Sequence, residues 1–139
     1  MKKVLIDINV LLDFLAKREH HESAAQVIAL CENKTIKGVI SSHEVTTLAY
    51  FLTERYKTRK NSRTVISEIL DLFTTVPVSE TILRKALNSK IDDYEDAVIE
   101  QAALHEKAAY IITSNISDFK SSAVSAKTPS EYLAMLNLK

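Results

Sequence analysis

Glycine and proline are scarce in this sequence, whose 139 residues include one glycine and two prolines. These residue types form the tight turns that join the strands of β-hairpins. Their scarcity predicts a protein that is mostly helical, with short strands and few tight hairpins. A single cysteine, Cys31, excludes an internal disulfide and fits a protein of the reducing cytoplasm.

The sequence also lacks an apolar run long enough to cross a membrane, so we expect no membrane partner. Residues 1–16 resemble a signal peptide, because two lysines precede an apolar stretch. Asp7 and Asp13 interrupt that stretch, and no small-residue cleavage site follows it. We therefore interpret the segment as part of the mature protein.

Net charge is lacking as well, since 18 basic residues balance 18 acidic ones. This balance argues against a protein that holds nucleic acid by bulk positive charge alone. One segment, residues 55–64, is nevertheless basic. Its basic residues are Arg55, Lys57, Arg59, Lys60 and Arg63. Two interpretations stay open for it, a solvated helix end or a patch that contacts RNA phosphates.

Short runs of branched apolar residues alternate with amphipathic segments along the chain. The expected strands cover 4–8, 37–41, 76–78 and 109–113. The expected helices cover 10–16, 21–32, 43–56, 61–73, 80–87, 96–107 and 128–136. Gly38 is interpreted as a stop signal before the second strand, and Pro129 as the first residue of the last helix. The alternation predicts an α/β fold with helices on both faces of a parallel sheet, and the length fits one domain, 1–139.

Polar residues follow the expected strands at the edge where such sheets bind their ligands. They are Asp7 and Asn9 after the first strand, Ser41, Ser42, His43 and Glu44 after the second, and Thr113, Asn115 and Asp118 after the last. Asp93 and Asp96 precede a helix that starts at the same edge. Clustered carboxylates repel one another unless a cation lies among them, and oxygen ligands of this kind suit Mg²⁺ or Mn²⁺. Such an ion can activate water, so the pattern indicates metal-assisted hydrolysis of phosphate esters.

Several of these acids also have a purely structural explanation. Asp92 and Glu95 fit a capping box, Glu44 fits a first-turn acid of its helix, and Asp118 fits a turn.

Two aspartates resist such an explanation. Asp7 closes a buried apolar strand, and Asp96 shares a helix row with Ile99 and Ala103. Burial of an unpaired carboxylate is unfavourable, so a functional role is favoured for Asp7 and Asp96.

Four stretches together resemble the PIN domain, a fold of metal-dependent ribonucleases that includes VapC-type toxins. They are VLIDINVLLDFL (4–15), ISSHEVTTLAYFL (40–52), DDYEDAVIEQAAL (92–104) and YIITSNISDF (110–119). The resemblance covers nearly the whole chain, and VPVSETILRKAL and TPSEYL extend it. It implies a three-layer α/β/α sandwich around a central parallel sheet.

The resemblance also implies roles for individual residues. Asp7 and Asp96 match the two principal metal-binding aspartates, Asp93 matches a further acid, and Asn9 matches a residue that orients Asp7. Two positions depart from the family pattern.

Thr47 stands where many members of the family have a glutamate, and Glu44, one turn earlier, is a candidate to replace it. Asn115 stands where many have a fourth acid, with Asp118 just beyond it. With Thr47 and Asn115 neutral, the implied site holds one metal ion rather than two, and weak, narrow or absent activity are all left open.

We therefore expect a Mg²⁺- or Mn²⁺-dependent endoribonuclease with RNA as its substrate. An antitoxin protein and a second copy of the chain are left open as protein partners. The alternative is a PIN-like module that binds RNA or protein without catalysis. A phosphatase is disfavoured because Asp7–Ile8–Asn9 lacks a second acid, and a phospho-acceptor domain because no lysine directly follows the late strand.

Overall fold

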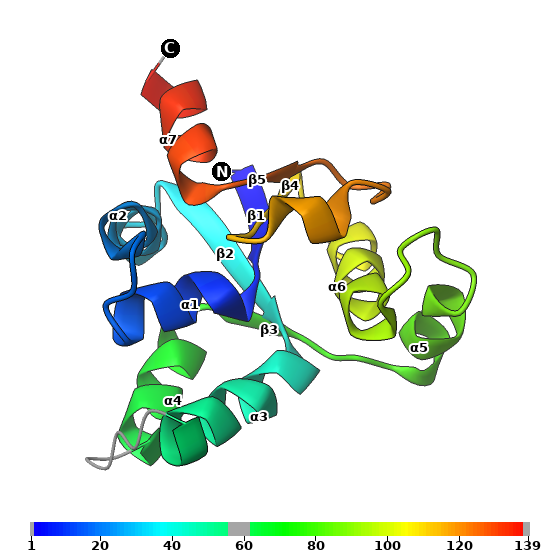
Figure 1. Cartoon of the computed structure of the whole chain (residues 1–139), viewed down its shortest axis with the longest axis horizontal. Coiled ribbons are helices and arrows are strands. Elements are labelled where there is room, and N and C mark those ends of the chain that lie inside the picture. The colour runs from blue at the N-terminus through cyan, green and yellow to red at the C-terminus, as the bar shows by residue number, and fades with distance from the viewer. Residues whose placement is uncertain (1, 56–61, 138–139) are drawn as a thin grey trace.

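A computed structural model describes residues 2–55 and 62–137, the side chain of Arg55 excepted. Five strands form one parallel sheet in the order β3-β2-β1-β4-β5 (Figure 1). The strands are β1 (Lys2–Ile6), β2 (Ile36–Ser41), β3 (Thr74–Val76), β4 (Tyr110–Ile112) and β5 (Ala126–Lys127). The helices are α1 (Ile8–Leu15), α2 (His21–Glu32), α3 (Ser42–Tyr50), α4 (Ser62–Leu72), α5 (Glu80–Ala86), α6 (Tyr94–His105) and α7 (Pro129–Asn137).

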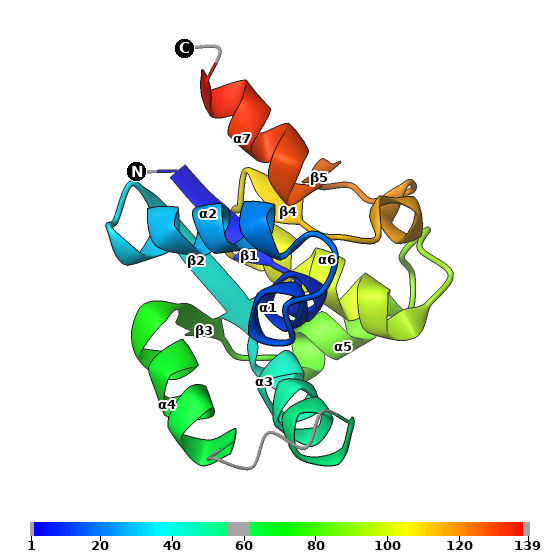
Figure 2. The same ribbon diagram turned by 60° about the vertical axis from the view of Figure 1, so that its left-hand side comes forward.

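Side chains of the central strands alternate between two apolar clusters, one on each face of the sheet. In β1, Val4 and Ile6 belong to the first cluster, while Leu5 belongs to the second. Helices α1, α2, α4 and α7 contribute to the first cluster, and α5 and α6 to the second (Figures 1 and 2). A strand buried on both faces reads as a continuous apolar run, as VLI does here. The expected α/β sandwich with a parallel sheet is confirmed.

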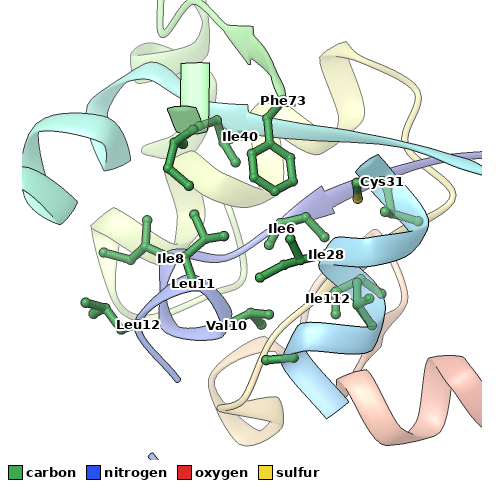
Figure 3. Close-up of a cluster of buried hydrophobic side chains, with 14 of the residues drawn as sticks. Ile6, Ile8, Val10, Leu11, Leu12, Ile28, Cys31, Ile40, Phe73 and Ile112 are labelled. Atoms are coloured by element: carbon green, nitrogen blue, oxygen red, sulfur yellow. The ribbon is translucent and has the colours of Figure 1, made fainter. Parts of the chain in front are cut away.

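The first cluster packs α2 and the end of α4 against β1 and β2. Figure 3 shows Ile28 and Cys31 of α2 facing Ile6 and Phe73 in this layer. Gly38 lies inside β2, paired with Val4 of β1, so its interpretation as a stop signal is wrong. Its missing side chain matters for packing instead, because a Cβ atom there would lie 2.7 Å from Cys31 Sγ and 2.7 Å from Phe73 Cδ1.

Several boundaries differ from the sequence-based expectation. The third strand ends at Val76, where Pro77 follows and cannot donate to the ladder. The helix expected over 43–56 is α3 continued by a π-helical turn, η1 (Phe51–Arg55). The 3₁₀ helix η2 (Ile116–Phe119) and the two-residue strand β5 were not expected, since such short elements leave little periodic pattern.

Within the described ranges, no helix combines the length and apolar character needed to cross a bilayer.

Candidate active site

The carboxyl ends of β1 and β4 bring Asp7 and Thr113 together. Ile6 pairs with Ile112, and the backbone N–H of Asp7 donates to the carbonyl oxygen of Ile112 at 2.9 Å. The residues that follow the two strands are therefore neighbours. Thr113 Oγ1 donates to Asp7 Oδ2 at 2.8 Å, and both residues are buried. Asp7 is also the N-cap of α1, so its position is fixed by the strand, the helix and this hydrogen bond.

Asn9 lies in the first turn of α1 and supplies a second donor to the same carboxylate oxygen. Its Nδ2 lies 3.4 Å from Asp7 Oδ2, a long hydrogen bond. Asn9 and Thr113 therefore both face Asp7 Oδ2. A hydrogen bond also joins the side chains of Asp7 and Glu44.

Glu44 is buried beside Asp7, which its position in the first turn of α3 alone does not explain. Its Oε2 accepts from the backbone N–H of Ile8 and its Oε1 from the hydroxyl of Ser41, both at 3.4 Å. Burial, followed by the charge of Asp7 and a hydrogen bond with it, raises the pKa of Glu44 well above its usual value. Sequence reasoning underestimated this residue, because the neighbours that bury it come from β1 and α1.

Asp96 and Asp93 lie at the start of α6. Asp93, and not Asp92, is the N-cap: its Oδ1 accepts from the backbone N–H of Asp96 at 3.1 Å. The interpretation of Asp92 and Glu95 as a capping box is therefore wrong. The helix begins at Tyr94, so Asp96 falls in its first turn with its side chain partly exposed.

Carboxylates from separate segments act on Asp96. Burial, followed by the charges of Asp93, Asp7, Asp118 and Glu95, raises the pKa of Asp96 from 3.8 to about 7. We call the group formed by Asp7, Glu44, Asp93, Asp96 and Asp118 the acidic edge. Its members come from the residue after β1, the first turn of α3, the start of α6 and the 3₁₀ helix η2.

The acidic edge is not a closed metal cage. Within the described part of the chain, no three His, Cys, Asp or Glu side chains are close enough to enclose an ion. The chemistry of the donors nevertheless fits a hard divalent cation, because several carboxylate oxygens repel one another where a cation would relieve the repulsion. The residues at this edge therefore share one electrostatic environment that favours positive charge.

The remaining predicted residues are placed less centrally. The Thr47 hydroxyl donates to the carbonyl oxygen of His43 in its own helix at 3.2 Å, and no hydrogen bond joins it to the acidic edge. Asn115 and Asp118 are exposed, and the backbone N–H of Asn115 donates to Thr113 Oγ1 at 3.0 Å. Arg63 is exposed on α4 and forms no ion pair with the described acids. Arg55 closes η1, but its side chain, together with Lys57, Arg59 and Lys60, lies outside the described residues.

His43, which the sequence places at this edge without a role, lies beside the site. Its Nδ1 lies 3.1 Å from Ser41 Oγ. Burial lowers its pKa, and the charges of Glu95 and Asp7 act in the opposite direction. The sequence signal was its place two residues after the end of β2, beside Glu44.

Stability of the metal-free protein should depend on pH through Asp96. Between pH 3.8 and about 7 the unfolded chain releases this proton while the folded protein keeps it. The free energy of unfolding therefore falls as pH rises through this window. Urea unfolding at several pH values, with a chelator present, measures the effect.

Asp96→Asn should remove that part of the pH dependence. His43 acts in the opposite direction, because its lowered pKa destabilises the folded state as pH falls, so the difference between wild type and Asp96→Asn is the informative quantity. A difference that stays constant from pH 4 to pH 7 would contradict the raised pKa of Asp96.

The fold and site define the class of protein: a three-layer α/β sandwich whose parallel sheet ends in clustered carboxylates. The sequence profile of the PIN domain matches residues 3–117. The chain therefore belongs to the PIN domain family. The match includes every member of the acidic edge except Asp118, which lies just beyond it. A search of curated proteins found no significant match.

Several solved structures share this fold, and one of them is a toxin–antitoxin complex. A chain of VapBC2 from Rickettsia felis, bound to a promoter DNA fragment, has a TM-score of 0.68 and 20% identity, covering 91% of this chain and 98% of its own. A toxin–antitoxin complex from Klebsiella pneumoniae gives 0.68 and 19%, covering 91% and 97%. A chain of FitAcB from Neisseria gonorrhoeae gives 0.66 and 18%, covering 91% and 98%. At these identities the likeness establishes the fold.

Proposed function

We propose that the protein is a metal-dependent endoribonuclease that hydrolyses RNA phosphodiester bonds. The observation that carries the proposal is the raised pKa of Asp96, caused after burial by carboxylates from four other positions. Strongly perturbed ionisable groups at one edge of a sheet are typical of functional sites. Purely structural acids would instead be spaced apart or paired with basic residues.

In this proposal Asp7 and Asp96 hold Mg²⁺ or Mn²⁺, and Asp93 and Asp118 support them through water. The bound ion would supply a Lewis acid that activates water for attack on the phosphodiester. Thr113 and Asn9 orient Asp7 by their hydrogen bonds to Oδ2. Glu44 supplies a buried acid next to Asp7. It would replace the glutamate that many members of the family carry at the position occupied here by Thr47.

The basic segment is the proposed contact with the RNA backbone. It comprises Arg55, Lys57, Arg59, Lys60 and Arg63. Salt-dependent contacts between lysine or arginine and phosphate supply affinity without reading sequence. Replacing these residues should therefore weaken binding of all RNA sequences about equally.

A protein antitoxin is the proposed partner. One solved structure with this fold is a toxin–antitoxin complex from Klebsiella pneumoniae, and the present chain covers nearly the whole length of its matched chain. In such a pair the antitoxin would cover the acidic edge and block access of RNA.

A second candidate function is a PIN domain that binds RNA or protein without cleaving it. The neutral residues Thr47 and Asn115 favour this candidate, as does the lack of a closed metal cage among the described residues. The two candidates differ in one measurable property, metal-dependent cleavage.

The decisive experiment incubates a mixed RNA substrate with the protein in Mn²⁺ or in chelator. We expect cleavage with Mn²⁺, none with chelator, and loss of cleavage in Asp96→Asn. Asp92→Asn is the matched control, because Asp92 lies four residues away in the same acidic stretch and is absent from the charges that act on Asp96. Metal-dependent cleavage that persists in Asp96→Asn would refute the assigned site, and RNA binding without cleavage would favour the second candidate.

A further inference from the structure

Asp13 is a buried carboxylate that the proposed chemistry does not use. It lies on α1, nearly two turns after Asp7, and is 6% exposed. A carboxylate is rarely buried to this extent unless it is paired and hydrogen-bonded. Its partners therefore indicate what it holds in place.

The first partner is Ser114, in the segment that follows β4. Ser114 Oγ donates to Asp13 Oδ2 at 2.5 Å, across a separation of 101 residues in the chain. Ser114 directly follows Thr113, whose hydroxyl donates to Asp7 Oδ2. Helix α1 thus holds this segment at two points, with Thr113 bound to the residue that caps the helix and Ser114 bound further along it.

The second partner is Arg18, just beyond the end of α1. Its Nε lies 3.0 Å from Asp13 Oδ1, and its backbone N–H donates to the carbonyl oxygen of Asp13 at 2.9 Å. Arg18 Nη2 also donates to the carbonyl oxygen of Asn9 at 3.3 Å. Asn9 is the residue whose amide forms the second hydrogen bond to Asp7 Oδ2.

Asp13 is therefore connected through one intervening residue to each of the two donors to Asp7 Oδ2. Ser114 connects it to Thr113, and Arg18 connects it to Asn9. We propose that Asp13 is a positioning residue that fixes the Asp7 carboxylate, acting on Thr113 through Ser114 and on Asn9 through Arg18. Residues that orient ligand side chains through hydrogen bonds commonly affect affinity almost as strongly as the ligands themselves. The functional consequence rests on the proposed function, because it assumes that Asp7 binds the metal, whereas the positioning itself can be measured without metal.

The test uses Ser114→Ala, which removes one link and keeps the Asp13–Arg18 pair. Ser89→Ala is the matched control, because Ser89 Oγ also donates to a buried carboxylate, that of Glu100, at 2.7 Å. Ser114→Thr restores the hydroxyl, and Asp13→Ala breaks both links but carries a greater risk of misfolding. The first readout is the carboxyl ¹³C resonance of Asp7 in metal-free protein, and the second is Mn²⁺ affinity by titration calorimetry.

We expect Ser114→Ala to shift the Asp7 resonance and to weaken Mn²⁺ binding by about threefold to tenfold, at or below the low end for a direct partner of a ligand. Ser114→Thr should restore both values, and Ser89→Ala should leave the Asp7 resonance unchanged while lowering the unfolding temperature. An Asp7 resonance that is equally unaffected in Ser114→Ala and Ser89→Ala would overturn the inference. If wild type binds no Mn²⁺, the proposed metal site fails, and the resonance still decides whether Asp13 positions Asp7.

Discussion

Asp7→Asn is expected to reduce metal-dependent RNA cleavage by at least ~100-fold, because loss of an outer partner alone commonly costs about 10–100-fold in metal affinity or activity. Asparagine keeps the shape of the side chain and still offers an oxygen to the Thr113 hydroxyl. It removes the negative charge at the point where β1, β4 and α3 converge. The measurement is the initial rate of cleavage of a labelled RNA at saturating Mn²⁺.

For the stability of the same variant, unlike its rate of RNA cleavage, we predict no loss. In chelator the Asp7 carboxylate lies beside the buried Glu44 and raises the pKa of that residue. Removing one of two neighbouring acids relieves this conflict, so the unfolding temperature of metal-free Asp7→Asn should equal or exceed that of wild type. Loss of cleavage together with unchanged or higher stability would separate a functional role of Asp7 from a structural one.

Asp71→Asn is the control for this pair of measurements, since Asp71 is an exposed acid on α4. It should leave both rate and stability at their wild-type values. An Asp7→Asn protein that cleaves RNA as fast as Asp71→Asn would remove Asp7 from the proposed metal site.

Gly38→Ala is expected to lower the free energy of unfolding by about 1–3 kcal/mol, the usual cost of overpacking a core. The added Cβ would lie 2.7 Å from Cys31 Sγ, and 2.7 and 2.9 Å from two ring atoms of Phe73. Both neighbours are buried between α2, α4 and the sheet, so neither moves without disturbing the first cluster. Urea unfolding at constant pH measures the change.

Two further variants identify the cause. Lys37→Ala changes an exposed neighbour in the same strand and should alter stability much less. Cys31→Ala removes the sulfur atom, so the double variant Gly38→Ala/Cys31→Ala should be more stable than the sum of the single changes predicts. Equal stability of Gly38→Ala and Lys37→Ala would show that the core accepts the extra methyl group without cost.

The two predictions concern different parts of one arrangement. Close packing at Gly38 fixes β2 against α2 and α4. Strand β2 leads directly into α3, whose first turn contains the buried Glu44. A loosened first cluster can therefore disturb the acidic edge without touching any carboxylate. Comparison of Mn²⁺ affinity between wild type and Gly38→Ala would reveal such coupling.

Much of the fold could be predicted from local pattern. Helix α2 covers the expected residues 21–32, because apolar side chains recur there at helical spacing. Pro129 begins α7 as expected, since the fixed backbone angle of proline suits a first helical position. The alternation of strands and helices was enough to predict a parallel sheet and the edge at which its polar residues gather.

The start of α6 shows where local pattern was insufficient. Four acids lie in the stretch 92–96, and several choices of N-cap satisfy the same capping preference. The structure selects Asp93 as the cap, which places Asp96 in the first turn, partly exposed and near Asp7. Which acid caps and which faces the sheet depends on how α6 packs, and the sequence of the helix does not contain that information.

The sequence by itself determined the element types, the parallel sheet and the residue types available at its edge, because these follow from periodicity along the chain. Only the tertiary structure decided that Glu44 is buried beside Asp7, that Asp96 responds to four other carboxylates, and that Asp13 contacts Ser114. The physical reason is that burial, Coulomb interaction and hydrogen bonding depend on distances between segments as far apart as residues 13 and 114. Those distances are set by the packing of the sheet and its helices.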